Sequence, residues 1–294
     1  MTSRLTITTP GVYTIPAATY HADPVPGRSL SHTGAIKLLP PSCPAKFDHW
    51  RHTPEEPNRE FDIGRSVHDL VLRGEDAVVI IDAEDWRTKE ARRKRDEAYG
   101  AGLTPLLIGK WQDVQAMAEA LWRHPVASAL LRGGRSEQSI FWRDELSGVW
   151  LRALLDFLPV RARGDMYGVD YKSCRCAHPD AIARAMWDYR YNQQAAWYLN
   201  ALSSADLIDD GAPFYFVFQE KSPPYVVTIA QLDDDALRWG RKLNRQAIDI
   251  YRRCVAANRW HGYSDEPVSV SLPTYAEYQL TDAAERGDFE SEAT

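Results

Sequence analysis

The stretch LRALLDFLPVRARGDMYGVDYKS, residues 151–173, decides how this chain folds. It spans most of two apolar runs, Val149–Leu158 and Tyr167–Tyr171, which are separated by the turn-prone pair Gly164-Asp165. Short apolar runs bounded by turn residues are typical of buried strands, and two such runs joined by a turn are typical of a hairpin. The sequence therefore predicts two paired strands at the centre of the fold.

Charged side chains interrupt both predicted strands. Asp156 lies in the first, and Asp170 and Lys172 lie in the second. Successive side chains of a strand point to opposite faces, so Asp170 and Lys172 share a face and Tyr171 points away. If the hairpin is in register, Asp156 lies within reach of that pair. Burying two carboxylates and an ammonium is costly unless they are paired, which makes a divalent metal the expected partner.

The predicted cluster suits metal-assisted hydrolysis of a phosphodiester. Carboxylate oxygens are hard ligands that suit Mg²⁺ or Mn²⁺, so Asp156 and Asp170 are candidate metal ligands, with the backbone carbonyl of Tyr171 as a further one. A metal there would lower the pKa of a bound water, and Lys172 would orient or deprotonate that water. Glu137, which opens the preceding strand, reaches the same end of the sheet if the strands are antiparallel. Taken alone, however, an Asp-x-Lys pair is more often an exposed ion pair.

Length and composition indicate an ordinary soluble globular protein. The chain has 294 residues, of which 44% are hydrophobic and 26% are charged. No clear linker interrupts it, so we expect one domain over residues 1–281, followed by an acidic, disordered tail over 282–294. No run of about 18 apolar residues is present, and the first residues lack the layout of a signal peptide. We therefore expect no membrane partner.

The cysteines indicate a reducing compartment. The four of them show no spacing of a disulfide framework, which favours free thiols in a cytoplasm, here that of a bacterium or a phage-infected host. An iron–sulfur cluster needs four thiolates, and it would have to use all of the cysteines although only the middle pair is close in sequence. We expect no such cluster. The four residues are Cys43, Cys174, Cys176 and Cys254.

Charge alone does not decide whether the chain binds nucleic acid. The formal net charge of −6 argues mildly against it, since phosphate contacts require clustered Lys and Arg. The segment Trp86–Arg95, however, is strongly basic, with Arg87, Arg92 and Arg93 among its cations. Such a run is usually a solvated helix face, and the functional alternative is a mobile arm that contacts a polyanion.

Hydrophobic periodicity and turn residues predict the remaining elements. We expect helices that begin at a Ser29 or Ser31 cap and end at Leu39, and over Ala45–His52, Phe61–Leu72, Leu107–Leu131 with a break near Pro125, Pro179–Leu202, and from a cap at Asp233 to Asn258. We expect strands over Glu137–Arg143 and in a second hairpin, Phe214–Phe218 with Tyr225–Ala230.

Two of these helices carry further candidate residues. His68 lies beside the apolar side of its helix, and by position alone it is more often a hydrogen-bonded core residue than a ligand. Gln194 and Tyr198 lie one turn apart and therefore on one face. The chain thus presents, in order, a His on a helix, a Glu, an Asp, an Asp-x-Lys pair, and Gln-x-x-x-Tyr on a helix.

This ordered set resembles the PD-(D/E)xK nuclease superfamily and, more closely, the family of exonuclease VIII C-terminal nuclease domains. The resemblance runs from about Leu30 to Tyr278. The motifs that carry it are GRSVHDLVL (Gly64–Leu72), the RT-x-x-x-R segment at Arg87, EQSIFWRDELSGVWLRALLDFL (Glu137–Leu158), VDYKS (Val169–Ser173), WDYRYNQQAAWYL (Trp187–Leu199), FYFVF (Phe214–Phe218) and SLPTY (Ser271–Tyr275).

The resemblance implies a fold and a role for each matching residue. It implies an α/β (α+β) PD-(D/E)xK core, in which helices flank a central mixed sheet, with an N-terminal loop and helix extension. It implies a two-metal type of hydrolysis, with His68 beside the metal and Lys172 as the catalytic lysine. The implied metal-ligating acids are Asp156 and Asp170, the acid that opens the strand is Glu137, and the residues that hold the substrate strand are Gln194 and Tyr198.

The resemblance also implies an activity and partners. Such proteins degrade one strand of linear double-stranded DNA from its 5′ end and leave a 3′ overhang for a single-strand annealing protein. They form homo-oligomeric rings around the DNA, in which only the channel need be basic. Arg152, Arg87, Arg92 and Arg93 are the expected DNA-binding cations. One departure is Leu154, where relatives tend to carry a second basic residue, so a cation near the scissile phosphate is missing.

Two alternatives stay open on the sequence. One is a nuclease-fold module that binds DNA or a protein with little or no catalysis, which Leu154 favours. The other is a nuclease of the same superfamily that acts on single strands or branched ends.

Overall fold

The structure, a computed structural model, describes residues 5–53, 63–74 and 78–289 of the chain. Its internal contacts divide it into two units, Met1–Trp260 and His261–Thr294. Every strand that the structure describes lies in the first unit, and helix α11 (Thr274–Glu285) lies in the second. The domain boundary expected after residue 281 falls inside α11 and stays a prediction.

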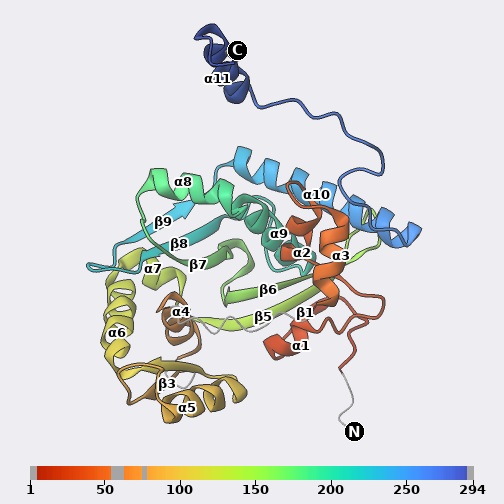
Figure 1. The fold of residues 1–294 in the computed structure, drawn as a ribbon. Helices are drawn as coiled ribbons and strands as arrows, with labels where there is room; N and C mark the ends of the chain where they lie inside the picture. Colours follow the sequence, from red (N-terminus) through yellow and green to blue (C-terminus); the bar gives the residue numbers. More distant parts are fainter. Residues whose placement is uncertain (1–4, 54–62, 75–77, 290–294) are drawn as a thin grey trace. The chain divides into compact units, whose positions relative to one another are not determined.

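The first sheet contains the N-terminal half of residues 151–173, the stretch that we call the diagnostic stretch (Figure 1). Four strands form it, in the order β1 (Gly11–Tyr13), β5 (Gly134–Arg143), β6 (Trp150–Pro159) and β2 (Leu30–Ser31). Strands β5 and β6 form an antiparallel hairpin, and β2 runs parallel to β6 on its other side. A segment from the start of the chain therefore borders the strand that carries Asp156.

The second sheet contains the other half of the stretch. Its order is β7 (Gly168–Cys174), β8 (Phe214–Glu220) and β9 (Val227–Gln231), with β7 and β8 parallel and β8 and β9 antiparallel. Helices α8 (Pro179–Asp188) and α9 (Tyr191–Ser204) form the crossover that a parallel pair requires. The second predicted hairpin, β8 with β9, is confirmed.

The hairpin predicted between β6 and β7 is wrong. The two strands contact each other, but no hydrogen-bonded register between them is found in the described part of the chain. Each already has stronger partners, because β6 pairs with β5 and β2 while β7 pairs with β8. Periodicity identified both strands correctly but carries no information about which strand pairs with which.

Helices cover the sheets and complete the fold. Helix α9 packs on β5, β6 and β7, and α10 (Asp234–Ala257) packs on α9 together with α2 (His32–Leu38) and α3 (Pro44–His52). Helix α4 (Ile63–Arg73) packs on β7 and on α6 (Ile108–Arg123), which α7 (Pro125–Leu130) follows. A smaller layer consists of β3 (Val78–Ile81), α5 (Lys89–Gly100) and β4 (Thr104–Leu107), and the short α1 (Ala17–His21) precedes β2. This confirms the predicted mixed α/β architecture with helices around mixed sheets.

Local signals set the ends of several helices. The Ser31 hydroxyl accepts a hydrogen bond from the Gly34 amide and caps α2, and the Asp233 carboxylate caps α10 in the same way. Pro125 ends one helix and begins the next, as predicted. The helix predicted over Pro179–Leu202 is instead two helices, because Arg190 adopts a left-handed backbone conformation with φ 57°. No helix among the described residues is both long and apolar enough to cross a bilayer.

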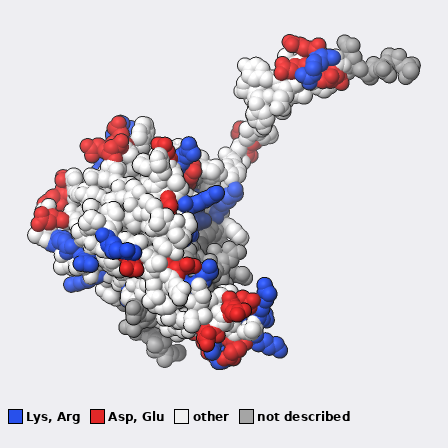
Figure 2. Space-filling view, turned by 90° about the vertical axis from the view of Figure 1, so that its left-hand side faces the viewer, with Lys and Arg blue, Asp and Glu red and all other residues white. Residues whose placement is uncertain are grey.

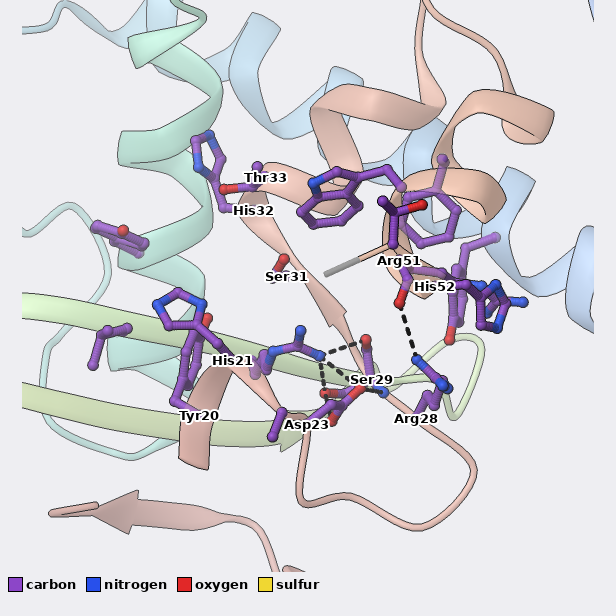
Figure 3. Close-up of a pocket in the computed structure, with 18 of the residues that line it drawn as sticks. Tyr20, His21, Asp23, Arg28, Ser29, Ser31, His32, Thr33, Arg51 and His52 are labelled. Carbon is purple, nitrogen blue, oxygen red and sulfur yellow. Dashed lines mark hydrogen bonds and ion pairs between the residues drawn. The ribbon is translucent and has the colours of Figure 1, made fainter. Parts of the chain in front are cut away.

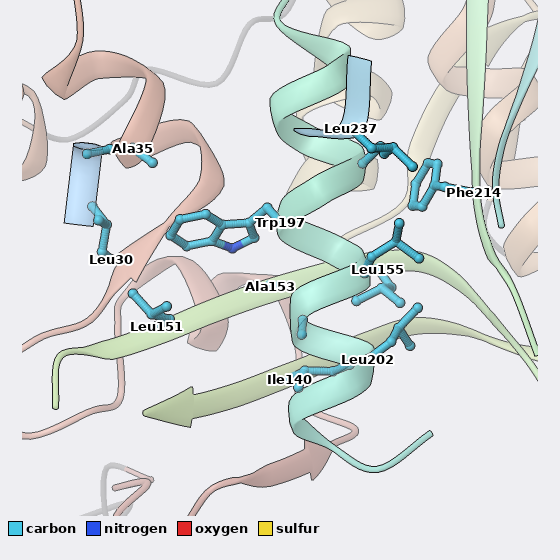
Figure 4. Close-up of a cluster of buried hydrophobic side chains, with 14 of the residues drawn as sticks. Leu30, Ala35, Ile140, Leu151, Ala153, Leu155, Trp197, Leu202, Phe214 and Leu237 are labelled. Carbon is cyan, nitrogen blue, oxygen red and sulfur yellow. The ribbon is translucent and has the colours of Figure 1, made fainter. Parts of the chain in front are cut away.

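Trp197 fixes α9 against the first sheet (Figure 4). It is fully buried beside Leu30, Ala35 and Leu151, which come from β2, α2 and β6. Its indole Nε1 donates a hydrogen bond to the Arg152 carbonyl at 3.0 Å, so burial leaves no polar group unpaired there. The helix that carries Gln194 and Tyr198 is therefore held rigidly over β6.

Candidate active site

Four ionisable side chains from α4, β6 and β7 meet where these elements converge. The His68 Nε2 atom lies 3.3 Å from the Asp156 carboxylate. The Lys172 Nζ atom lies 2.6 Å from the Asp170 carboxylate. The two carboxyl groups are close enough to influence each other's ionisation. We call these four residues the charged quartet; it joins the two halves of the diagnostic stretch although β6 and β7 do not pair.

The electrostatics of the charged quartet follow from burial and from alternating charge. Burial raises the pKa of Asp170 to about 6, against the opposing effect of Lys172 and with a further increase from Asp156. Burial would also raise the pKa of Asp156, but the hydrogen bond and the charge of His68 lower it below its usual value. Burial would lower the pKa of His68, yet its hydrogen bonds to Asp156 and Asp69 raise it to about 10. The imidazole is therefore a cation at neutral pH.

A set of supporting contacts orients His68. Its Nδ1 atom lies 3.4 Å from the Asp69 carboxylate, which also accepts a hydrogen bond from the Thr104 hydroxyl and pairs with Arg73. A carboxylate behind a histidine fixes the ring and strengthens the basicity of its other nitrogen. Sequence reasoning did not single out Asp69 or Thr104. The only available signal was the acidic neighbour of His68 in the chain.

Glu137 lies next to the charged quartet in an unusual conformation. It falls between the register pairs Ser136–Phe157 and Gln138–Leu155, and therefore opposite Asp156. Its φ is 50°, a left-handed value that costs a non-glycine residue roughly 1–3 kcal/mol. Its carboxylate lies 3.7 Å from the Arg73 guanidinium. Its assignment as a catalytic acid stays a prediction.

Helix α9 supplies the polar wall of the site. The Gln194 side-chain amide donates a hydrogen bond to the Asp170 carboxylate at 3.0 Å. Burial and the charges of Asp156 and Asp170 raise the pKa of Tyr198 well above its ordinary value, so the phenol keeps its proton. Burial and the nearby Lys172 ammonium lower the pKa of His32 to about 3, so that ring is neutral. His32 was not predicted from the sequence.

A cleft of about 680 Å³ opens beside Asp156 and Tyr198 (Figure 3). Its walls come mainly from α1, β2, α2 and α3 and combine basic with aromatic side chains, among them Arg28, Arg51 and Trp50. Arginines and aromatic rings side by side suit phosphates and bases. Neither arginine belongs to a motif that was recognised in the sequence.

The cation expected from β6 is held by protein groups. The Arg152 guanidinium forms an ion pair with Asp23 at 2.7 Å and donates hydrogen bonds to the Ser29 carbonyl and hydroxyl oxygens at 2.8 Å. Leu154 lines the same cleft, as alternation along β6 requires. Contact of Arg152 with DNA therefore stays a prediction. The cleft keeps Arg28 and Arg51 as cations in spite of Leu154, although Arg51 is paired with Asp48 at 2.6 Å.

The basic segment Trp86–Arg95 enters helix α5 at Lys89. Arg93 pairs with Glu90 at 2.7 Å and with Glu97 on the same helix. Arg92 donates hydrogen bonds to backbone carbonyls, and Arg87 pairs with Asp85 at 3.2 Å. Figure 2, which views one face of the molecule, shows acidic and basic side chains in small interspersed groups. The DNA-binding role of these three arginines stays a prediction.

Comparison with known proteins identifies the family. Residues 37–270 match the family described as "PDDEXK-like domain of unknown function (DUF3799)". The chain belongs to this family. A crystal structure of a "putative exonuclease" from Eubacterium rectale has a similar fold, with a TM-score of 0.57 and 11% identity over 90% of this chain and 98% of that chain. A search of curated proteins finds no match to the sequence. Family and fold place the chain in the PD-(D/E)xK nuclease superfamily and support a nuclease.

Nucleases of this superfamily generally use divalent metals, and the donor set fits one only in part. In the described part of the chain, no three His, Cys, Asp or Glu side chains are grouped to hold a metal ion. The available pair is Asp156 and Asp170, and two carboxylates suit Mg²⁺, which retains several waters. His68 and Lys172 now provide the positive charge that these carboxylates need. Ligation by His68 or by the Tyr171 carbonyl stays a prediction.

Proposed function

We propose that this protein is a Mg²⁺- or Mn²⁺-dependent exonuclease of the exonuclease VIII type, which resects linear double-stranded DNA from 5′ to 3′. The observation that carries the proposal is the charged quartet beside a cleft that holds arginines and aromatic rings. A buried carboxylate with a raised pKa, Asp170, beside the half-buried carboxylate of Asp156 is the environment expected of a site that handles a cation and a phosphate.

Each residue has a defined task in this proposal. Asp156 and Asp170 would hold the metal, which when bound polarises the phosphodiester and acidifies a water. Lys172 lies on the same strand face as Asp170 and orients that water. Burial lowers the pKa of the lysine, but the Asp170 and Asp156 carboxylates raise it by more, so the ammonium would have to lose its proton before it could act as a base. Gln194 holds the Asp170 carboxylate, and Tyr198 offers a phenolic hydrogen-bond donor at the cleft. His68 balances the charge of Asp156 whenever the cation is absent.

The proposed biological role is resection for single-strand annealing. The 3′-ended strand would pass to an annealing protein, and the enzyme would act as a homo-oligomeric ring. A ring accounts for how a chain of net charge −6 can act on a polyanion, since only the surface that faces the DNA has to be basic.

A time course on end-labelled linear duplex, with and without Mg²⁺, tests the proposal. We expect nucleotide release only when the metal is present. Because the proposed polarity is 5′ to 3′, a 5′ label should be released earlier than a 3′ label. We expect Lys172→Ala to abolish this release. Faster cleavage of single-stranded or branched DNA than of duplex would favour the single-strand alternative. The absence of cleavage in every arm would contradict a nuclease.

A binding module without catalysis is the second candidate, and the pairing of both carboxylates with protein cations favours it. Calorimetry with Mn²⁺ separates the two. A competent site takes up the ion in the wild type and loses it in Asp156→Ala, whereas an idle cluster binds none in either protein.

A further inference from the structure

An aromatic ridge leads away from Lys172 along the junction of α8 and α9. It consists of Tyr191, Tyr189 and, two residues earlier in the chain near the end of α8, the exposed Trp187. The Lys172 Nζ atom lies 5.0 Å from the centroid of the Tyr191 ring. The rings of Tyr191 and Tyr189 are stacked, with centroids 5.5 Å apart and planes 26° from parallel. The ridge therefore begins at the charged quartet.

The inner end of the ridge is anchored and the outer end is open. Tyr191 packs against Phe216 and Phe218 of β8, with ring centroids 5.4 and 6.0 Å apart. By contrast, 65% of Tyr189 and 66% of Trp187 is exposed to solvent. Large aromatic surfaces held in water beside a reaction site mark a binding surface more often than they mark a defect of packing.

A cation accompanies the exposed rings. The Arg190 guanidinium lies 4.5 Å from the centroid of the Trp187 ring. Arg190 has a left-handed backbone with φ 57° and ψ 39°, which breaks the path from α8 into α9 next to the exposed Tyr189. Because this conformation is unfavourable for a residue with a Cβ atom, its presence here points to a requirement at this junction. Asp188 is the acidic residue of the same turn.

We propose that the aromatic ridge binds an unpaired nucleic-acid strand by stacking its bases on Tyr189 and Trp187. Rings that already form a stack can be extended by a base, and they lose little conformational entropy when they do so. Duplex DNA keeps its base faces covered, so stacking on this ridge selects nucleotides that have separated from their partners. The inference rests on the proposed function for its substrate class, and it assigns the single-stranded part of that substrate to a specific surface.

The test measures binding without cleavage. Fluorescence anisotropy follows a labelled oligothymidylate in EDTA, with a hairpin-closed blunt duplex as the second probe. Tyr189→Ala and Trp187→Ala are each expected to weaken oligothymidylate binding by about 5- to 100-fold and to leave duplex binding within about twofold. The salt dependence of the remaining affinity should not change, because no phosphate contact is removed. Tyr189→Phe should bind as the wild type does.

Tyr278→Ala is the control. Tyr278 is 68% exposed, about as much as Tyr189 and Trp187 are, and lies in α11, outside every predicted binding segment. Unchanged oligothymidylate affinity in the double variant of Trp187 and Tyr189 overturns the proposal, as do an equal loss for duplex or an equal loss in Tyr278→Ala. An unchanged melting temperature shows that the variants are folded.

Binding and cleavage fail separately in this design. If the ridge variants lose oligothymidylate binding while the wild type cuts no DNA, the result supports the ridge as a strand-binding surface and contradicts the nuclease assignment. If the wild type cuts duplex while the ridge variants bind oligothymidylate normally, the nuclease assignment holds and the ridge proposal is wrong.

Discussion

The charged quartet and helix α5 both hold dense charge, but they hold it in opposite ways. In the charged quartet, Asp170 is 1% exposed and Lys172 is 21% exposed, so each charge depends on its neighbour. On α5, Arg93 is 56% exposed and still has two carboxylates from its own helix. Water would solvate the charges of α5 even if their ion-pair partners were removed. Removing one member of the charged quartet would instead leave a buried charge unpaired, which costs much more free energy. Burial, more than the density of charge, therefore distinguishes a candidate site from a solvated surface.

The largest expected difference lies between two lysines, one from each region. Lys172→Ala should lower the rate of nucleotide release from linear duplex by about 10²- to 10⁴-fold, the range of a lost general base or orienting group. Lys94→Ala, which removes an exposed α5 lysine paired with Glu90, should leave the rate unchanged. Initial rates in Mg²⁺ measure both. Equal rates for Lys172→Ala and the wild type would remove the charged quartet from the chemistry.

The next difference concerns stability and two arginines. Arg152→Ala should lower the free energy of unfolding by about 3–5 kcal/mol, since it leaves the buried Asp23 carboxylate without its partner. Arg93→Ala should leave the urea midpoint unchanged, because its partners are solvated. Adding Asp23→Ala to Arg152→Ala should recover part of the loss. If the midpoint does not move in Arg152→Ala, the pair is not structural and the arginine is free to bind substrate.

A smaller effect is expected behind His68. Asp69→Asn should reduce activity or Mn²⁺ affinity by about 10- to 100-fold, as is usual for a group that orients a residue of a metal site. The matched change on α5, Asp96→Asn, alters an exposed carboxylate beside Arg95 and should have no effect on either quantity. Calorimetry and initial rates decide the matter, and wild-type values for Asp69→Asn would leave His68 as an ordinary core histidine.

The smallest expected effect tests whether α5 contacts DNA. If α5 lies on the path of the DNA, Arg92→Ala should lower the salt slope of binding by about one. Arg93→Ala should change it less, because Glu90 and Glu97 already neutralise that charge. Binding isotherms at several salt concentrations give the slope. An unchanged slope for Arg92→Ala would show that α5 is only a solvated surface.

The sequence was sufficient for elements whose signal is local. The cap at Asp233, the break at Pro125 and the hairpin of β8 with β9 were all predicted from neighbouring residues, and of the two predicted caps Ser29 and Ser31 the structure uses Ser31. Pairing across the fold was not predicted, since β7 finds its parallel partner β8 about 40 residues further along the chain.

The residues of the candidate site also differ in whether a local signal predicted them. Asp170 and Lys172 share a strand, so alternation placed them together. Asp156 was first placed beside them by a hairpin of β6 with β7 that does not form, and the superfamily resemblance then assigned both Asp156 and His68 to the site. Arg28, Arg51 and the neutral His32, which line the cleft, were not predicted, because they carry no periodic or motif signal.

Strand β2 has a practical consequence for anyone who trims this protein. The family match begins at residue 37, after β2 and after Arg28 and His32. A fragment cut to the matched region would keep both aspartates and the lysine, yet it would lack one side of the cleft. It would also expose the free edge of β6, and an uncovered strand edge recruits other chains. Such a fragment would be expected to precipitate before it could be assayed, so inactivity measured on it would say nothing about the enzyme.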